Sequence, residues 1–317
     1  MCGWGTALRL ESVPMAGTTQ ALKQRIDHWQ QSNASASVGY GVVKKYGEDK
    51  GSQLSALITY YGFFSLFPAL LAAFTILGFV LQGNAEFRER IAETISERLP
   101  LPGIDATSLK GSGFALLVGL LLALWSGLGA TQVLQDAIQK VFRAENSAPS
   151  SFLVRRLLGL RLLAVVGFGV VASAASTALV ASLPLGGKIG GLIAGVGINA
   201  LVTAALIKLS VPKLVSWVDL RWAALFGGLG WTLLGSIGAW YTERLVSNSD
   251  KTYGVFAVVI GLLSWIYLQA QVLVYAAEIG AVTHQRLYPR SLLKDTPTAI
   301  DTELSASERS ATTGPTK

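Results

Sequence analysis

The sequence is poor in the residues that build disulfides and metal sites. It has one cysteine, Cys2, and two histidines, His28 and His284, among 317 residues. A single cysteine cannot form a disulfide within the chain or complete a cysteine-based metal site. Neither histidine has a second metal-binding side chain three or four residues away, the spacing that places two ligands on one face of a helix. We therefore expect no disulfide, no bound metal and no other cofactor.

Charge is also scarce, and the apolar residues are unevenly distributed. Charged residues make up 14% of the chain and hydrophobic residues 51%, with a mean hydropathy of +0.48, whereas soluble domains carry roughly a quarter charged residues. The apolar residues form about six runs, each long enough to cross the ~30 Å hydrocarbon core of a bilayer as a helix. A soluble protein with so many buried helices would have too little polar surface. The predicted fold class is an all-α, polytopic membrane helix bundle with about six transmembrane helices.

The predicted spans cover residues 54–81, 113–134, 157–183, 187–209, 221–241 and 254–282. Pro68 lies near the middle of the first span, where it removes one backbone hydrogen bond and kinks the helix. The second span contains Ser126, Gly127 and Gly129, so it is either a crossing helix or a re-entrant segment.

Three regions are expected around these spans. Residues 1–53 form an N-terminal segment with an amphipathic helix, in which Leu22, Ile26 and Trp29 share one face. Residues 54–288 form the membrane domain, including a helix near 85–99 on the outer surface. Residues 289–317 are rich in Ser, Thr and Asp and are expected to be disordered.

The distribution of Lys and Arg predicts the orientation, because cytoplasmic loops carry the excess of positive charge. Basic residues concentrate before the first span, between the second and third, between the fourth and fifth, and after the sixth. Both termini are therefore predicted to be cytoplasmic. The first 50 residues contain no cleavable signal, so the first span should act as an uncleaved anchor. Met1 and Met15 are both open as the start.

Small residues predict where helices pack closely in a membrane. Gly187, Gly191 and Gly195 lie four residues apart on the fourth predicted span and form one stripe. A similar stripe on the second span consists of Gly119, Ala123 and Gly127. Two interpretations remain open: simple packing of a compact bundle, or helices that slide or bend as in a transporter.

Polar groups within or beside the spans are candidate functional residues, because charge in hydrocarbon is costly. With the predicted orientation they gather toward the inner leaflet. The candidate substrate-binding residues are Arg161, Glu278, Tyr60, Tyr61, Asp136, Gln269 and Gln271. Three interpretations are open: Arg161 and Glu278 form an ion pair, they line a cavity for an anionic headgroup, or the charges snorkel at helix ends.

Several motifs resemble the YihY/BrkB family of bacterial inner-membrane proteins, and within it the YhjD-like members. The resemblance covers residues 38–288. It is clearest in Ala56-Leu-Ile-Thr-Tyr-Tyr-Gly-Phe-Phe-Ser-Leu-Phe-Pro68, in Lys251-Thr-Tyr-Gly-Val-Phe-Ala257 and in Leu263-Ser-Trp-Ile-Tyr267. Further matching segments are Leu124-Trp-Ser-Gly-Leu-Gly129, Leu134-Gln-Asp136 and Ala277-Glu-Ile-Gly280, the last of which places Glu278 on the family pattern.

The resemblance implies a role in the bacterial envelope, and its YhjD-like branch is connected with the export or handling of lipopolysaccharide or other lipids. The family has also carried a ribonuclease label (ribonuclease BN), widely regarded as a misassignment. The sequence argues against a nuclease, because it shows no carboxylate or histidine cluster able to hold two metals. The net charge of +7 is distributed as expected for a membrane protein.

We therefore predict a non-enzymatic protein of the bacterial inner membrane that transports or flips an anionic envelope lipid. The alternatives are a non-transporting envelope-integrity scaffold and, least favoured, a membrane ribonuclease. No G-x-x-x-x-G-K-[ST] motif occurs, so transport would use an ion gradient, a partner ATPase or the lipid gradient. The expected partners are membrane lipids, with a second copy of the chain or an envelope protein as further candidates, and no nucleic acid.

Overall fold

The computed structural model describes residues 15–81, 113–144, 151–181, 185–211, 215–248, 254–293 and 295–312. Every regular element within these ranges is a helix, which confirms the all-α prediction. The chain divides into two compact units, Tyr46–His284 and a smaller unit made of Met1–Lys45 with Gln285–Lys317. The surface helix predicted near 85–99 lies outside the described residues.

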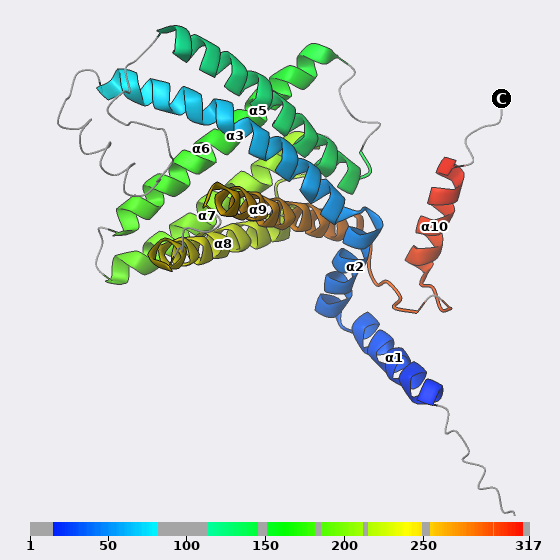
Figure 1. Ribbon diagram of the computed structural model, residues 1–317. Coiled ribbons are helices and arrows are strands. Elements are labelled where there is room, and N and C mark those ends of the chain that lie inside the picture. Colours follow the sequence, from blue (N-terminus) through cyan, green and yellow to red (C-terminus); the bar gives the residue numbers. More distant parts are fainter. Residues whose placement is uncertain are drawn as a thin grey trace, which may run out of the picture. The chain divides into compact units, whose positions relative to one another are not determined.

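The larger unit contains six described helices (Figure 1). Each contains one of the predicted spans, except that the last two residues of the third span, 182–183, lie outside the described residues. The six helices are α3 (Gly51–Leu81), α5 (Gly113–Val141), α6 (Phe152–Ala181), α7 (Leu185–Ser210), α8 (Arg221–Asn248) and α9 (Gly254–Gln285). In the described residues, five helices are long and apolar enough to cross a membrane. The remaining helix, α8, contains the predicted fifth span but is not among these five.

The second predicted span lies in one continuous helix. α5 has 29 residues, which corresponds to about 43 Å at 1.5 Å per residue, more than the thickness of the hydrocarbon core. The structure thus favours a crossing helix over a re-entrant segment. Pro68 lies inside α3, and the helix continues beyond it to Leu81.

The buried core of the larger unit lies at the end where α5, α7 and α9 finish and α3 and α8 begin. On α5, Leu134, Ile138 and Val141 recur at helical spacing and are buried. Ala277 and Ala281 on α9 have no exposed surface. The far halves of the helices expose large apolar side chains, among them Phe114, Phe168 and Phe256. Such exposed apolar surface is what a helix presents to lipid.

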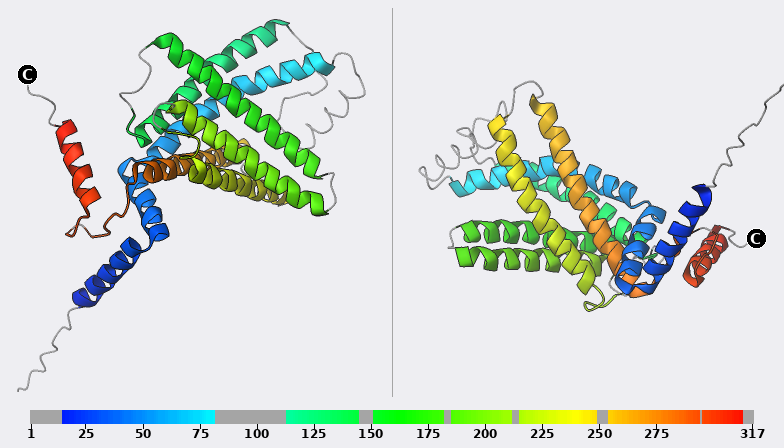
Figure 2. Two further views of the ribbon diagram at one scale, coloured as in Figure 1. Left: turned by 180° about the vertical axis from the view of Figure 1, so that it is seen from behind. Right: turned by 90° about the horizontal axis from the view of Figure 1, so that it is seen from below.

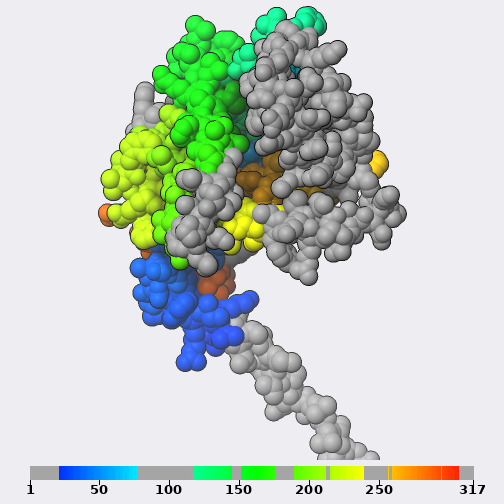
Figure 3. All heavy atoms as spheres, turned by 90° about the vertical axis from the view of Figure 1, so that its left-hand side faces the viewer, coloured from blue at the N-terminus to red at the C-terminus, as the bar shows by residue number. Residues whose placement is uncertain are grey.

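Helix α7 packs against α6 and against α8, and the neighbouring surfaces of α6 and α7 are visible in Figure 3. The glycines that allow the close approach of α7 and α8 belong to α8. A Cβ atom added to Gly228 would lie 2.6 Å from the Val196 carbonyl oxygen and 2.8 Å from the Ala200 Cβ. One added to Gly227 would lie 2.5 Å from the Thr203 side chain.

Of the glycine stripe predicted on α7, Gly195 does not make this contact. A Cβ added to Gly195 would meet no atom within 4 Å, so this residue does not have the packing role predicted for it. Gly187 and Gly191 share its stripe at intervals of four residues. The reason is the rotation of α7, which turns Val196 and Ala200 toward α8 instead. Two helices can cross closely when only one of them has small residues at the crossing point.

The smaller unit consists of α1 (Met15–Ser32), α2 (Ala34–Glu48, of which the last residues belong to the larger unit) and the C-terminal α10 (Ala299–Thr312) (Figure 2). Asn33 separates α1 from α2, and its side-chain oxygen accepts hydrogen bonds from the backbone N–H groups of Ser35 and Ala36 at 3.1 and 3.3 Å. This is an N-cap, which satisfies amide donors that have no partner within the helix.

The tail that was expected to be disordered contains α10, so the prediction for 289–317 was wrong over its described helical part. Thr298 and Asp301 form a capping box at the start of α10. The Thr298 N–H donates to Asp301 Oδ2 at 3.2 Å, and the Asp301 N–H donates to Thr298 Oγ1 at 3.3 Å. Polar composition alone predicted disorder, whereas this cap and the contacts with α1 and α2 order the segment.

Two carboxylates, the buried Asp27 and the half-buried Asp301, connect the tail to α1 and α2. Asp27 accepts a hydrogen bond from the Leu292 N–H at 2.8 Å. Asp301 accepts one from the Ser291 N–H at 2.8 Å and forms ion pairs with Lys44 at 2.8 Å and Arg290 at 2.5 Å. We call this group of contacts the tail clasp.

Replacing Asp301 with asparagine is expected to release the tail clasp. Burial alone would raise the pKa of Asp301, but hydrogen bonds from Lys44, Ser291, Arg290 and Thr298 hold it well below its ordinary value. A lowered carboxyl pKa contributes stability above its unfolded value, near pH 4, which is lost as the pH falls through the folded value. Arg290 is 2% exposed, so trypsin should cleave after it much faster in Asp301→Asn.

The matched control is Glu303→Gln, on the exposed side of the same helix. In a Cys2→Ser background, a fluorophore at Glu303→Cys should show falling anisotropy as the pH drops below about 4. Equal cleavage of the two variants, or anisotropy that is constant through this range, would contradict the clasp.

Candidate lipid-binding site

Glu278 is fully buried in α9. It has no exposed surface, and neither do its neighbours Ala276, Ala277 and Ala281. Gly280, two residues later, packs closely: a Cβ there would lie 3.2 Å from the Phe142 ring. Glu278 therefore lies within the packed end of the bundle and away from its surface.

Two tyrosines stack beside this region. The rings of Tyr46 and Tyr275 are parallel within 5° and their centroids are 4.1 Å apart. Tyr46 precedes the first span, and burial raises the pKa of its phenol, although a hydrogen bond with Ser55 lowers it in part. This stacking joins the end of α2 to α9 and was not anticipated from the sequence.

Arg161, unlike Glu278, lies on the outer surface of its helix. It is exposed, whereas the next residue, Leu162, has no exposed surface. Successive helical residues are about 100° apart, so the burial of Leu162 turns Arg161 outward. Val154, Leu157 and Phe168 on the same side of α6 are also exposed, at 48%, 57% and 69%. Arg161 is thus a cation within an apolar outer stripe.

The ion pair between Arg161 and Glu278, one of the three interpretations of the sequence, is not formed. Arg161 has no hydrogen bond or ion pair with any residue that the structure describes. Glu278, by contrast, is 0% exposed. The sequence places the two residues at a similar depth in the membrane. Their helices are rotated, however, so that Glu278 faces the interior of the bundle and Arg161 faces outward.

Asp136 is exposed at the end of α5, where it pairs with Arg155 at 3.0 Å across to α6. The adjacent Arg156 contacts two aromatic rings: its guanidinium carbon is 5.7 Å from the Trp125 ring and 5.1 Å from the Phe152 ring. Such distances suit cation–π interactions. The basic and aromatic residue types are visible in the sequence, but their juxtaposition requires the antiparallel packing of α5 and α6.

The other predicted site residues do not gather around Arg161. Tyr60 and Tyr61 lie on α3, are 57% and 42% exposed, and contact each other edge-to-face at 5.5 Å. Gln269 and Gln271 are half-buried on α9. The Gln269 carbonyl oxygen accepts a hydrogen bond from the Trp231 indole at 3.2 Å, which connects α9 to α8.

A chain of polar side chains crosses three helices and was missed by the sequence analysis. Ser173 on α6 donates to Asn199 Oδ1 on α7 at 3.0 Å, and Asn199 Nδ2 donates to Thr232 Oγ1 on α8 at 3.1 Å. Interhelical hydrogen bonds of this kind hold membrane helices together. Asn199 stands out within its apolar run, and this polar interruption was the available signal.

These features define a polytopic all-α membrane protein with a packed polar end and apolar outer surfaces. Among the described residues, no three His, Cys, Asp or Glu side chains are grouped to hold a metal ion. The chain belongs to the family described as Virulence factor BrkB, whose family model matches residues 42–300. This confirms the family resemblance found in the sequence motifs.

Three relatives illustrate the range of the family. YfkH of Bacillus subtilis, which is named ribonuclease-like, is 24% identical over 267 residues, covering 76% of this chain and 93% of the relative. The inner membrane protein YhjD of Escherichia coli is 24% identical over 293 residues, covering 80% and 83%. The membrane protein RSc1559 of Ralstonia nicotianae is 26% identical over 285 residues, covering 83% and 61%. No solved structure matches the chain.

Proposed function

We propose that this protein resides in the inner membrane and moves an anionic envelope lipid, of lipopolysaccharide or phospholipid type, between the leaflets. The name of the Escherichia coli relative, an inner membrane protein, supports the location. The observation that carries the proposed activity is the exposed Arg161, a cation without a protein partner among the described residues, set in an apolar stripe of a membrane-spanning helix.

The charge of Arg161 requires a neutralising partner at this depth in the membrane. An arginine that faces lipid is stabilised by water or by the phosphate of a lipid headgroup. The guanidinium presents a planar fork of donors that matches a phosphate in a bidentate geometry. Arg161 is nine residues after the start of α6 at Phe152, or roughly 14 Å along the helix. A headgroup bound there would be drawn toward the hydrocarbon, and this lowers the barrier to crossing.

The surrounding surface fits the remainder of a lipid. Beyond Arg161, α6 exposes Phe168 on the same side, at 69%, and Val171 next to it, at 67%. Acyl chains would lie along this surface. On another side of α6, Arg156 with the exposed Trp125 and Phe152 offers a second basic and aromatic contact at headgroup level.

The test is a reconstitution in liposomes that contain a fluorescent anionic lipid in the inner and outer leaflets. Chemical bleaching from outside reports how fast the inner pool becomes accessible. We expect the purified protein to accelerate this exchange for phosphatidylglycerol more than for phosphatidylcholine. A rate equal to that of protein-free liposomes, with the protein folded and inserted, would support the scaffold alternative instead.

A further inference from the structure

Helix α1 has one buried face and one exposed apolar face. Asp27 and Gln30 are 6% and 4% exposed and lie on the buried face. Leu22, Ile26 and Trp29 are 59%, 47% and 61% exposed. These three residues follow the i, i+4, i+7 spacing and therefore form one stripe along the helix. We call it the α1 stripe. Its exposure shows that the packing of the smaller unit leaves it uncovered among the described residues.

Two cations flank the α1 stripe. At 100° per residue, Lys23 lies on one side of the stripe and Arg25 on the other, and both are exposed. Neither has a hydrogen bond or ion pair among the described residues. The one acidic side chain of α1, Asp27, is turned away and engaged by the Leu292 N–H. The exposed side of α1 is thus apolar in its centre and basic at its edges.

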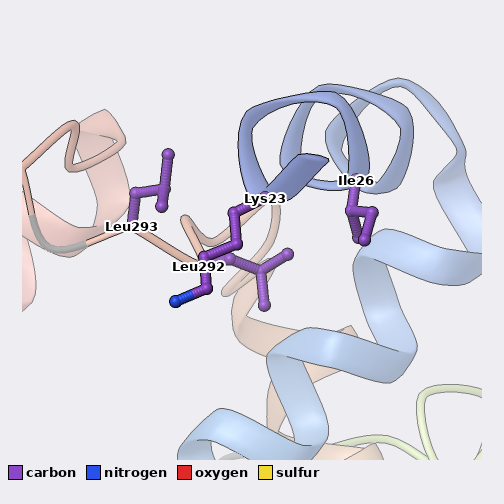
Figure 4. Close-up of a pocket in the computed structure, with 4 residues that line it drawn as sticks. All are labelled: Lys23, Ile26, Leu292 and Leu293. Carbon is purple, nitrogen blue, oxygen red and sulfur yellow. The ribbon is translucent and has the colours of Figure 1, made fainter. Parts of the chain in front are cut away.

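The tail extends this surface. Leu292, 38% exposed, lies beside α1 because its N–H binds Asp27. Together with Leu293 it lines a shallow, open depression of about 380 Å³ against Lys23 and Ile26 (Figure 4). The depression is open to its surroundings, so we interpret it as part of an apolar surface rather than as an enclosed site.

We propose that the α1 stripe lies on an anionic lipid surface, the leaflet at which α3 begins its crossing. Charge complementarity selects this occupant: Leu22, Ile26 and Trp29 would enter the boundary between headgroups and acyl chains, while Lys23 and Arg25 extend toward phosphates. Juxtamembrane basic residues are attracted to anionic leaflets in this way. The inference does not depend on the proposed transport activity.

The covalent structure keeps α1 near that leaflet. α2 has 15 residues, which corresponds to about 22 Å. Only Asp49 and Lys50 separate it from α3, the first membrane-spanning helix. The helix therefore stays within reach of the bilayer in every arrangement of the two units, and a modest affinity for lipid is enough to hold it there.

The experiment uses the full chain with Cys2→Ser, reconstituted in nanodiscs of phosphatidylcholine with or without phosphatidylglycerol. An environment-sensitive fluorophore is attached at Ile26→Cys on the stripe, or at Gln24→Cys on the exposed opposite side of the same helix. Lipids with brominated acyl chains then report contact by quenching. We expect strong quenching at position 26 in anionic discs, less in neutral discs, and little at position 24 in both.

A double variant tests the contribution of the two basic side chains. Lys23→Gln with Arg25→Gln should shift the equilibrium between bound and free helix roughly thirtyfold toward the free state, since each basic residue contributes about 1 kcal/mol near an anionic surface. Equal quenching at positions 24 and 26 would overturn the proposal. So would a blue shift at 26 without lipid quenching, because it would show that a protein surface, such as a second copy of the chain, covers the stripe.

Discussion

Replacing Arg161 with alanine is expected to slow the movement of anionic lipid about ten- to a hundredfold. The reason is the loss of charge-assisted hydrogen bonds to a phosphate, which contribute about 1.5–3 kcal/mol, while each 1.36 kcal/mol corresponds to a factor of ten. Folding should be unaffected, because Arg161 is exposed and has no partner among the described residues. The measurement is the leaflet-exchange rate in liposomes, with thermal stability in detergent recorded for each variant.

Two further variants make this result specific. Arg161→Lys keeps the charge but loses the bidentate geometry, so it should retain an intermediate rate. Arg221→Ala removes another exposed arginine, which lies 5.9 Å from the Trp222 ring at the start of α8, and should leave the rate unchanged. A well-folded Arg161→Ala protein with the original rate would exclude Arg161 from the lipid path.

The relation between Arg161 and Glu278 can be examined in the same assay. Glu278 is fully buried and does not pair with Arg161. Residues without contact or a shared partner have additive effects. Arg161→Ala combined with Glu278→Gln should therefore change the exchange rate by the product of the two single effects. A double variant no slower than either single variant would restore the ion-pair interpretation.

Replacing Gly228 with alanine is expected to destabilise the bundle by about 1–3 kcal/mol, and Gly228→Leu by more. The added Cβ would lie 2.6 Å from the Val196 carbonyl oxygen and 2.9 Å from the Ala200 amide nitrogen. Both atoms belong to the backbone of α7, which can yield only if the two helices separate. The free energy of unfolding in mixed micelles, measured by titration with a denaturing detergent, tests the expectation.

The matched control is Gly235→Ala on the same helix. A Cβ at Gly235 would meet no atom within 4 Å, and alanine has a higher helix propensity than glycine by up to about 1 kcal/mol. This variant should be neutral or stabilised. If Gly228→Ala behaved in the same way, the close crossing of α7 and α8 would be disproved.

The candidate site shows how far sequence patterns reach. The charge of Arg161 within an apolar run marks it as unusual whatever its neighbours are, and so does the carboxyl of Glu278. Whether the two meet depends on how α6 and α9 are rotated about their axes. A run that is apolar on all sides contains no periodic signal for this rotation. The burial of Leu162 and of Glu278 decides it.

The ordered tail shows that composition alone cannot predict contacts between distant segments. Thr298 and Asp301 have the spacing of a capping box and thus carried a local signal for α10. The partner that completes the charge arrangement, Lys44, lies 257 residues earlier in the chain. Composition reports the average polarity of the segment, and it contains no information about a contact at that separation.

By itself the sequence determined the all-α membrane class, the positions of the long apolar helices and the family, because hydrocarbon thickness and unpaired backbone groups strictly limit what an apolar run can form. Tertiary structure alone decided that Arg161 faces outward, that Gly228 rather than Gly195 allows a close helix crossing, and that the tail joins α1 and α2. These features depend on helix rotation and on partners far apart in the chain. Side-chain packing between helices specifies both, and neither can be read from one segment alone.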